Sequence, residues 1–257
     1  MIQVHDVTKM IQDKVILQNI DVTINKGCVT SLIGPNGAGK STLLSVITRL
    51  IDYNSGEVTI DGKRMEAYRS NALAKKIAIL KQTNHTELNI TVEELVRFGR
   101  FPYSKGHLKK EDIAQVEQAL ELLQLQDIRQ RYLKTLSGGQ RQRAYIAMTI
   151  AQNTDYILLD EPLNNLDMRH SVQIMQTLRH LAQTLDKTIV IVLHDINFAS
   201  CYSDYIVALK HGALVKSDKT EAVIQRDVLK TLYDMDVRIE RIGQQRICIY
   251  YDEANEI

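Results

Sequence analysis

Two short stretches of this sequence have the residue types of a phosphate-binding site. The first, GPNGAGKS at residues 34–41, consists of a glycine, four further residues and Gly-Lys-Ser, which is the P-loop pattern. Its glycines let backbone amides turn inward around phosphate oxygens, while Lys40 reaches the outer phosphates and Ser41 supplies a hydroxyl to Mg²⁺. A strand-like stretch precedes it and a helix-like stretch follows. The pattern therefore predicts a nucleotide site rather than an ordinary glycine turn.

Three apolar strands end in polar side chains that suit phosphate chemistry. YILLDEP ends with Asp160, which can hold Mg²⁺, and Glu161, which can polarise an attacking water. IAILKQ ends in Gln82, which can touch both the ion and the water. IVIVLHD contains His194, which can reach the terminal phosphate. Each residue taken alone also fits a solvated or structural role at a strand end, and the P-loop in the same chain favours the catalytic role.

The second stretch, LSGGQRQR at residues 136–143, repeats the glycines and hydroxyl of a phosphate cradle. Ser137, Gly138 and Gly139 stand where an amphipathic helix begins, so free amides face outward at a positive helix end. The P-loop already encloses the phosphates from one side. We therefore expect a dimer in which each subunit covers the nucleotide of the other, or else a capped helix start without a ligand.

The segments around these residues indicate an α/β fold. Apolar strands that alternate with helices imply a mostly parallel sheet covered on both faces. Strands are predicted at 2–7, 15–24, 28–34, 56–62, 77–82, 156–162 and 187–195, helices at 40–51 and 169–185, and a hairpin at 205–218.

A helical segment is predicted at 84–153, inserted into the α/β core of a single domain that covers 1–257. Thr91 and Glu94 form a capping box ahead of a helix at 92–101. A second helix at 111–125 has apolar residues on one face at helical spacing, namely Ile113, Val116, Ala119, Leu120 and Leu123. The tail at 221–257 is predicted as a C-terminal extension with a helix at 226–233 and a strand at 246–251.

Composition limits the classes of partner. Lys and Arg number 32 against 31 Asp and Glu, so the net charge of +1 gives no general attraction to nucleic acid or anionic lipid. The three scattered cysteines are typical of a reducing compartment rather than of a disulfide framework or zinc site. The N-terminus lacks an export-signal pattern, and the apolar runs fall short of the ~20 residues that cross a bilayer, so any membrane role is expected to be peripheral.

Together these motifs resemble the nucleotide-binding subunits of ABC transporters over nearly the whole chain. GPNGAGKST, Gln82, LSGGQ, YILLDEP, NNLD at 164–167 and His194 occur in that family's order. The resemblance implies a P-loop ATPase core with an antiparallel β portion near the N-terminus and an inserted α-helical subdomain. It also implies Mg²⁺ bound with ATP by Ser41, Gln82 and Asp160, and catalysis by Glu161, His194 and Gln82.

The same resemblance assigns the remaining site residues. It implies a head-to-tail homodimer in which one subunit's Asp167 communicates across the interface. Contacts to ATP are implied for Gly34, Pro35, Asn36, Gly37, Ala38, Gly39, Lys40, Ser41 and Thr42, and contacts to the other subunit's ATP for Ser137, Gly138, Gly139 and Gln140. Ile11 departs from the family, which usually places an aromatic residue there against adenine. An aliphatic side chain covers the base without a π-face, so we expect weaker discrimination of ATP from GTP.

Two further segments point to a cargo. ELVRFGRFP at 94–102 and VLKTLYDMDVRIE at 228–240 look like the ATPases of ferric-siderophore importers, whose relatives include those for cobalamin and haem. The likeness implies a peripheral protein on the cytoplasmic face of the membrane, partnered by an integral-membrane permease and indirectly by an extracytoplasmic substrate-binding protein.

Alternatives remain for both the segment and the protein. Phe98, Phe101 and Tyr103 can instead pack a helix end, with Arg100 solvated. The chain can also be an exporter ATPase or a soluble ABC ATPase that acts on nucleic acid or ribosomes. A single ATPase half, a short insert and near-neutral charge favour transport without a nucleic-acid partner.

Overall fold

The computed structural model of this chain describes residues 1–82 and 89–251. They divide into two compact units, one made of residues 1–67 and 190–251 and the other of residues 68–82 and 89–189. The second unit is thus inserted in the sequence of the first, and strand β8 (Thr188–Val192) spans their boundary.

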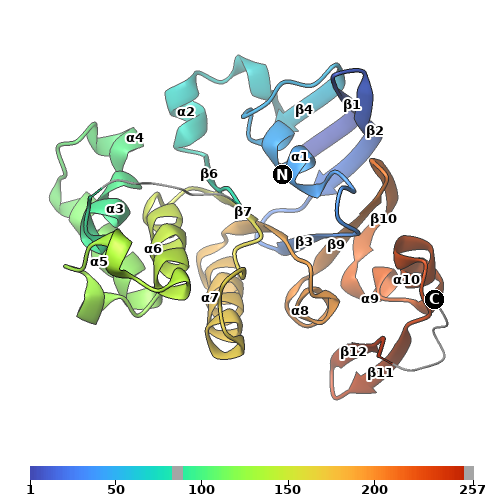
Figure 1. Cartoon of the computed structure of the whole chain (residues 1–257). Helices are drawn as coiled ribbons and strands as arrows, with labels where there is room; N and C mark the ends of the chain where they lie inside the picture. Colours follow the sequence, from blue (N-terminus) through green and yellow to red (C-terminus); the bar gives the residue numbers. More distant parts are fainter. Residues whose placement is uncertain (83–88, 252–257) are drawn as a thin grey trace. The chain divides into compact units, whose positions relative to one another are not determined.

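An antiparallel sheet forms the start of the first unit (blue in Figure 1). Its order is β2-β1-β4-β5, with bounds Lys14–Ile24, Ile2–Ile11, Ser55–Ile60 and Lys63–Arg64. Gln12 and Asp13 join β1 to β2 with φ of 45° and 59°, the positive values that a two-residue hairpin turn requires. The antiparallel portion expected near the N-terminus is confirmed.

The parallel part of the first unit pairs β3 (Val29–Ile33) with β9 (Tyr205–Lys210). Strand β9 turns at His211 and Gly212 into the antiparallel β10 (Ala213–Lys219), as the predicted hairpin requires. Helix α1 (Lys40–Ile47) follows β3. It ends earlier than predicted because Arg49 has a φ of 57°, which lies outside the right-handed helical region.

The C-terminal part of the first unit contains three helices and a hairpin. The helices are α8 (Ile196–Tyr202), α9 (Thr220–Val223) and α10 (Arg226–Tyr233), and the hairpin pairs β11 (Arg238–Ile242) with β12 (Gln245–Ile249). The helix predicted at 226–233 and the strand near 246–251 are confirmed, whereas α8 and β11 were not predicted.

The second unit combines two parallel strands with helices. Strand β6 (Ile77–Leu80) pairs in parallel with β7 (Tyr156–Asp160). Helices α3, α5 and α6 pack against one another and lie together in green in Figure 1. The helices are α2 (Ser70–Ala74), α3 (Val92–Phe98), α4 (Phe101–Ser104), α5 (Lys110–Leu122), α6 (Gly138–Ala151) and α7 (Met168–Leu185), with shorter 3₁₀ turns at 126–128 and 133–135.

The predicted limits of the helical subdomain and the C-terminal extension stay predictions. The expected start of the subdomain, near Asn84, and the last residues of the extension lie outside the described residues. The described helices α3 to α6 fall between Val92 and Ala151, within the predicted segment.

Two details of the helical prediction are wrong. The helix expected at 92–101 ends at Phe98 and α4 begins at Phe101, because Pro102 has no N–H to donate to the Phe98 carbonyl and cannot continue α3. Gly99, between the two helices, is closely packed, since an added Cβ would lie 2.2 Å from the Met148 carbonyl oxygen. Ile113 is exposed, although the other four residues predicted on its face are buried. The first turn of α5 instead buries Asp112, whose Oδ1 accepts a hydrogen bond from Arg100 Nε at 2.9 Å.

Candidate functional site

The loop between β3 and α1 has the geometry that the P-loop pattern predicts. Gly34, Gly37 and Gly39 have φ of 141°, 76° and 99°, which L side chains rarely adopt. A Cβ on Gly34 would lie 2.0 Å from the Leu209 carbonyl oxygen, and one on Gly39 would lie 2.7 Å from Leu17 Cδ2. The glycines are therefore required both by backbone conformation and by close packing.

The charged end of Lys40 lies inside this loop. Lys40 is buried at the first position of α1, and its Nζ donates to the carbonyls of Gly34 at 2.7 Å and Pro35 at 2.9 Å. Ser41 and Thr42 follow in the first helical turn, where the backbone amides lack partners within the helix. An ammonium group and a positive helix end thus converge on one loop, which suits polyphosphate.

Ile11 lies at the tip of the β1–β2 hairpin in the same unit. Its side chain is 47% exposed, and Met10 beside it is 39% exposed. Further along β2, Ile16 and Leu17 lie against Gly39, so the hairpin runs beside the phosphate loop. An exposed aliphatic group at this position is available to cover a flat base.

The acidic pair lies in the second unit, at the end of the fully buried β7. Asp160 is 6% exposed and Glu161 is 9% exposed. Glu161 Oε2 accepts hydrogen bonds from Gln82 Nε2 at 2.5 Å and Asn164 Nδ2 at 2.7 Å. Because β6 and β7 are parallel neighbours, their carboxyl ends bring Gln82 and Glu161 together, as the strand-end argument predicts.

Asn164 was not singled out from the sequence, although it holds Glu161 as directly as Gln82 does. Its backbone N–H donates to the Glu161 carbonyl at 3.3 Å, which closes a turn after the strand. Glu161 has a φ of 51°, a strained conformation that costs roughly 1–3 kcal/mol and is frequent at functional sites. Two sequence signals include this residue: it is the first residue of the NNLD motif at 164–167, and an Asn three residues after the acid can close a turn with its amide.

His194 lies in the unit that contains the phosphate loop. The preceding Leu193 extends β8 by donating its N–H to the Leu32 carbonyl at 3.2 Å. His194 is exposed, and the next residue, Asp195, caps α8 by accepting from the Asn197 N–H at 2.7 Å. The histidine thus occupies the strand end that the sequence predicts, in the unit that does not contain Glu161.

The second cradle starts α6 as a complete capping box. Ser137 Oγ accepts from the Gln140 N–H at 3.2 Å, and Gln140 Oε1 accepts from the Ser137 N–H at 3.1 Å. A Cβ on Gly138 would lie 3.4 Å from Asn165 Cβ, and one on Gly139 would lie 3.2 Å from the Asn165 carbonyl oxygen. The start of α6 and the NNLD segment therefore pack together within one unit.

Asp167 ends the NNLD segment as the N-cap of α7. It accepts from the His170 N–H at 2.8 Å, and its other oxygen pairs with His170 Nδ1 at 2.8 Å. The His170 backbone amide, and then its side chain, hold the pKa of Asp167 below the usual value. The carboxylate is consequently ionised and oriented at the start of the helix.

The end of helix α3 and the start of α4 carry an exposed apolar surface next to a buried ion pair. Phe98 and Phe101 are 53% and 56% exposed and line a groove of about 310 Å³ with Ile90, Arg97 and Leu108. Arg100 is 6% exposed and ion-paired with Asp112, so the alternative is wrong for a solvated Arg100 and for packed phenylalanines. It is correct for Tyr103, which is half-buried and has the Arg100 guanidinium 4.0 Å from its ring centroid.

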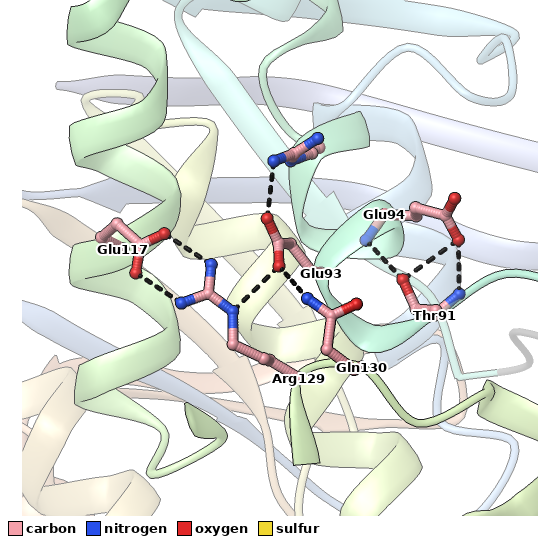
Figure 2. Close-up of polar contacts among 7 residues, drawn as sticks. Thr91, Glu93, Glu94, Glu117, Arg129 and Gln130 are labelled. Atoms are coloured by element: carbon pink, nitrogen blue, oxygen red, sulfur yellow. Dashed lines mark hydrogen bonds and ion pairs between the residues drawn. The ribbon is translucent and has the colours of Figure 1, made fainter. Parts of the chain in front are cut away.

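Figure 2 shows the polar contacts that fix α3 to its neighbours. Glu93 accepts from Arg129 Nε at 2.9 Å and Gln130 Nε2 at 2.7 Å, while Arg129 forms a two-pronged pair with Glu117 of α5. Arg129 above all holds the pKa of Glu93 below its usual value. Thr91 and Glu94 form the predicted capping box. The groove residues on α3 thus belong to a helix whose first turn is held in place by ion pairs and hydrogen bonds.

The oxygen groups predicted for the ion suit Mg²⁺ chemically. A serine hydroxyl, a carboxylate and an amide oxygen are hard donors, and such sites are usually completed by phosphates and waters. No group of three or more His, Cys, Asp or Glu among the described residues is arranged as a protein-only metal site. In residues 1–82 and 89–251, no helix is long and apolar enough to cross a membrane.

Known proteins share this organisation. The family model described as ABC transporter matches residues 17–164. The petrobactin import ATP-binding protein YclP of Bacillus subtilis (strain 168) is 57% identical over 98% of this chain and 100% of its own length. The iron(3+)-hydroxamate import ATP-binding protein FhuC of the same organism is 39% identical over 93% of this chain and 91% of its own.

A solved structure of an ATP-binding cassette has the same fold as this chain. The dimeric post-hydrolysis state of the ATP-binding cassette MJ0796, bound to ADP and Pi, has a TM-score of 0.77 and 33% identity, covering 86% of this chain and 99% of that one. The α/β P-loop fold class predicted from the sequence is therefore confirmed. The chain belongs to the ABC transporter family and is one of its ATPases.

Proposed function

We propose that this chain is the ATP-binding subunit of an importer for a ferric siderophore, in which ATP hydrolysis drives uptake through a separate permease. The observation that carries the proposal is the buried Glu161 carboxylate held by Gln82 and Asn164 at the end of β7. A fixed carboxylate at such a strand end is suited to orient a water for attack on a phosphate. The import proteins YclP and FhuC support the cargo class.

ATP binding is assigned to the phosphate loop. The backbone of residues 34–42 surrounds the phosphates, with N–H groups from the residues other than Pro35, while Lys40 neutralises the phosphate charge and Ile11 covers the adenine from the hairpin tip. The left-handed glycines support this assignment, because they turn the backbone without a side chain in the way.

Bound Mg²⁺ would neutralise charge on the outer phosphates. We assign its protein contacts to the hydroxyl of Ser41, the amide oxygen of Gln82 and the carboxylate of Asp160. The amide nitrogen of Gln82 already donates to Glu161, so the oxygen of the same amide is the atom assigned to the ion. Gln82 therefore links ion binding to the position of the catalytic carboxylate.

Hydrolysis is assigned to Glu161 and His194. Glu161 accepts a hydrogen bond from the attacking water and withdraws its proton as the water oxygen bonds to the terminal phosphorus and the bond from that phosphorus to the bridging oxygen breaks, releasing ADP. His194 donates to the terminal phosphate. General-base groups of this kind contribute typically about 10²–10⁴-fold to rate.

The second cradle belongs to a homodimer in this proposal. Ser137, Gly138, Gly139 and Gln140 face the terminal phosphate held by the other subunit, and Asp167 lies beside them at the interface. Because Asn165 packs against Gly138 and Gly139, a movement of the start of α6 on contact with the nucleotide would also move the NNLD segment. The dimeric state of the cassette MJ0796 agrees with such an arrangement.

The groove beside Phe98 and Phe101 is assigned to a cytoplasmic helix of the permease. Exposed aromatic groups with a polar rim suit a protein partner, and the anchoring of Glu93 by Arg129 supports transmission of force through α3. The protein would then lie peripherally on the cytoplasmic face of the membrane. A substrate-binding protein outside the membrane would deliver the cargo.

Uptake of radio-iron tests this function. Iron-starved cells would carry the wild-type protein, no protein or Glu161→Gln, and would receive ferric petrobactin, a ferric hydroxamate, haem or labelled cobalamin. Loss of uptake of one ferric siderophore in both defective strains supports the proposal and names the cargo. Loss of only cobalamin or haem uptake would reassign the cargo, and normal uptake of every compound would contradict siderophore import.

A further inference from the structure

The histidine assigned to the terminal phosphate lies in a short link between a strand and a helix. Before it, the Leu193 N–H donates to the Leu32 carbonyl of β3 at 3.2 Å. After it, Asp195 caps α8 by accepting from the Asn197 N–H at 2.7 Å. The strand side of the link is therefore fixed by β3, and the position of His194 depends on where α8 begins.

The C-terminal hairpin holds the first two turns of α8. Its strand β12 lies beside that helix (Figure 1). The Asn197 side chain pairs with the backbone of Cys248 in both directions, since its Oδ1 accepts from the Cys248 N–H at 2.7 Å and its Nδ2 donates to the Cys248 carbonyl at 3.1 Å. One turn later, Ser200 Oγ donates to the Arg246 carbonyl at 2.6 Å. These hydrogen bonds join α8 to β12.

The hairpin has attachments of its own, so it can support the helix. Arg246 Nη1 donates to the Glu221 carbonyl, and to the Ile224 carbonyl at 3.4 Å, which ties β12 to the end of α9. Cys248 is buried. Because a buried polar group left without a partner costs about 1–3 kcal/mol, loss of the Asn197 amide should shift α8 against β12 until water reaches the Cys248 backbone.

We propose that Asn197 is a positioning residue for hydrolysis, which fixes the start of α8 against the C-terminal hairpin and thereby holds His194 in place for the terminal phosphate. The inference rests on the role of His194 in the proposed function. It gives the hairpin a role in the rate of hydrolysis, although the sequence assigns none of its residues to the site.

The test compares ATP hydrolysis with Mg-ATP binding in Asn197→Leu, made in the full chain. Leucine is similar to asparagine in size and has the higher helix propensity, so the variant removes both side-chain bonds to Cys248 without weakening α8 itself. We expect kcat to fall about three- to tenfold, as loss of one or two hydrogen bonds implies. The Kd for Mg-ATP should change less than about twofold, because residues 34–42 keep their contacts.

Two further variants show whether the effect is specific to the contact between α8 and β12. Ser200→Ala removes the bond to Arg246 and should lower kcat in the same direction. Lys230→Met breaks an exposed ion pair with Asp236, elsewhere in the C-terminal extension, and should match the wild type. A Lys230→Met variant that loses as much kcat as Asn197→Leu would contradict the inference.

A double-mutant cycle with His194→Ala separates positioning from a structural role. Release of labelled phosphate resolves the low residual rate of His194→Ala. If Asn197 acts through His194, adding Asn197→Leu to His194→Ala should leave kcat within about twofold of His194→Ala alone. The same fold-loss in both backgrounds, or a lower thermal midpoint of Asn197→Leu with an unchanged kcat, would overturn the positioning role alone. Hydrolysis by His194→Ala at the wild-type rate, or no hydrolysis by the wild type, would overturn the proposed function as well.

Discussion

Alanine at two glycines of the phosphate loop should have very different costs. At Gly37, where φ is 76°, a Cβ meets nothing within 4 Å, so Gly37→Ala costs only the left-handed conformation, about 1–2 kcal/mol. At Gly34 the Cβ would lie 2.0 Å from the Leu209 oxygen. Gly34→Ala therefore has two costs in the free energy of unfolding: about 1–3 kcal/mol for the steric overlap with Leu209 and about 1–3 kcal/mol for the strained backbone conformation.

Urea unfolding followed by circular dichroism, without nucleotide, measures both costs. We expect the free energy of unfolding to fall by about 2–6 kcal/mol in Gly34→Ala, against about 1–2 kcal/mol in Gly37→Ala. Gly62→Ala is a control outside the loop, since its φ is 74° and a Cβ there also meets nothing within 4 Å. Equal losses at Gly34 and Gly37 would refute the argument that Gly34 is required by its contact with β9.

Three further predictions concern the ion pair beneath α3 and the base contact. Arg100→Met should lower the free energy of unfolding by about 3–5 kcal/mol, because it leaves the Asp112 carboxylate buried without its ion-pair partner. Arg97 is half-exposed, so Arg97→Met should lower the free energy of unfolding by only about 0.3–0.5 kcal/mol. Similar losses in the two variants would contradict the burial argument. The Lys109 amide first, and then Arg100, hold the pKa of Asp112 below its usual 3.8, so its contribution is present above about pH 4 and is lost as pH falls through the lowered pKa. Acid unfolding of Asp112→Asn should therefore depend less steeply on pH below 4, and an unchanged slope would exclude this carboxylate. Ile11→Tyr should lower the Kd for ATP relative to GTP in a titration, and an unchanged ratio would exclude a base contact at the hairpin tip.

The sequence alone predicted the features that follow from strand direction and backbone conformation. The glycines at 34, 37 and 39 have the positive φ values that the P-loop pattern implies. Gln82 and Glu161 are hydrogen-bonded because both follow buried strands that are parallel neighbours. Neither result required the identity of distant side chains.

Features set by distant contacts were not predictable. The close packing of Gly99 against the Met148 carbonyl joins segments about fifty residues apart, and the exposure of Ile113 arises because Asp112 is buried with Arg100. Strand β11 was missed because its alternation is weak, with four of its five residues exposed.

The central claim, a Glu161-dependent ATPase that closes as a dimer on ATP, is tested most directly by light scattering of Glu161→Gln. The substituted amide keeps an oxygen for the hydrogen bonds from Gln82 and Asn164 but removes the charge that polarises water. We predict that hydrolysis falls about 10²–10⁴-fold while ATP binding remains. The variant should therefore be dimeric at saturating ATP and Mg²⁺ and monomeric with ADP. A monomer under both conditions, or hydrolysis at the wild-type rate, would contradict the account.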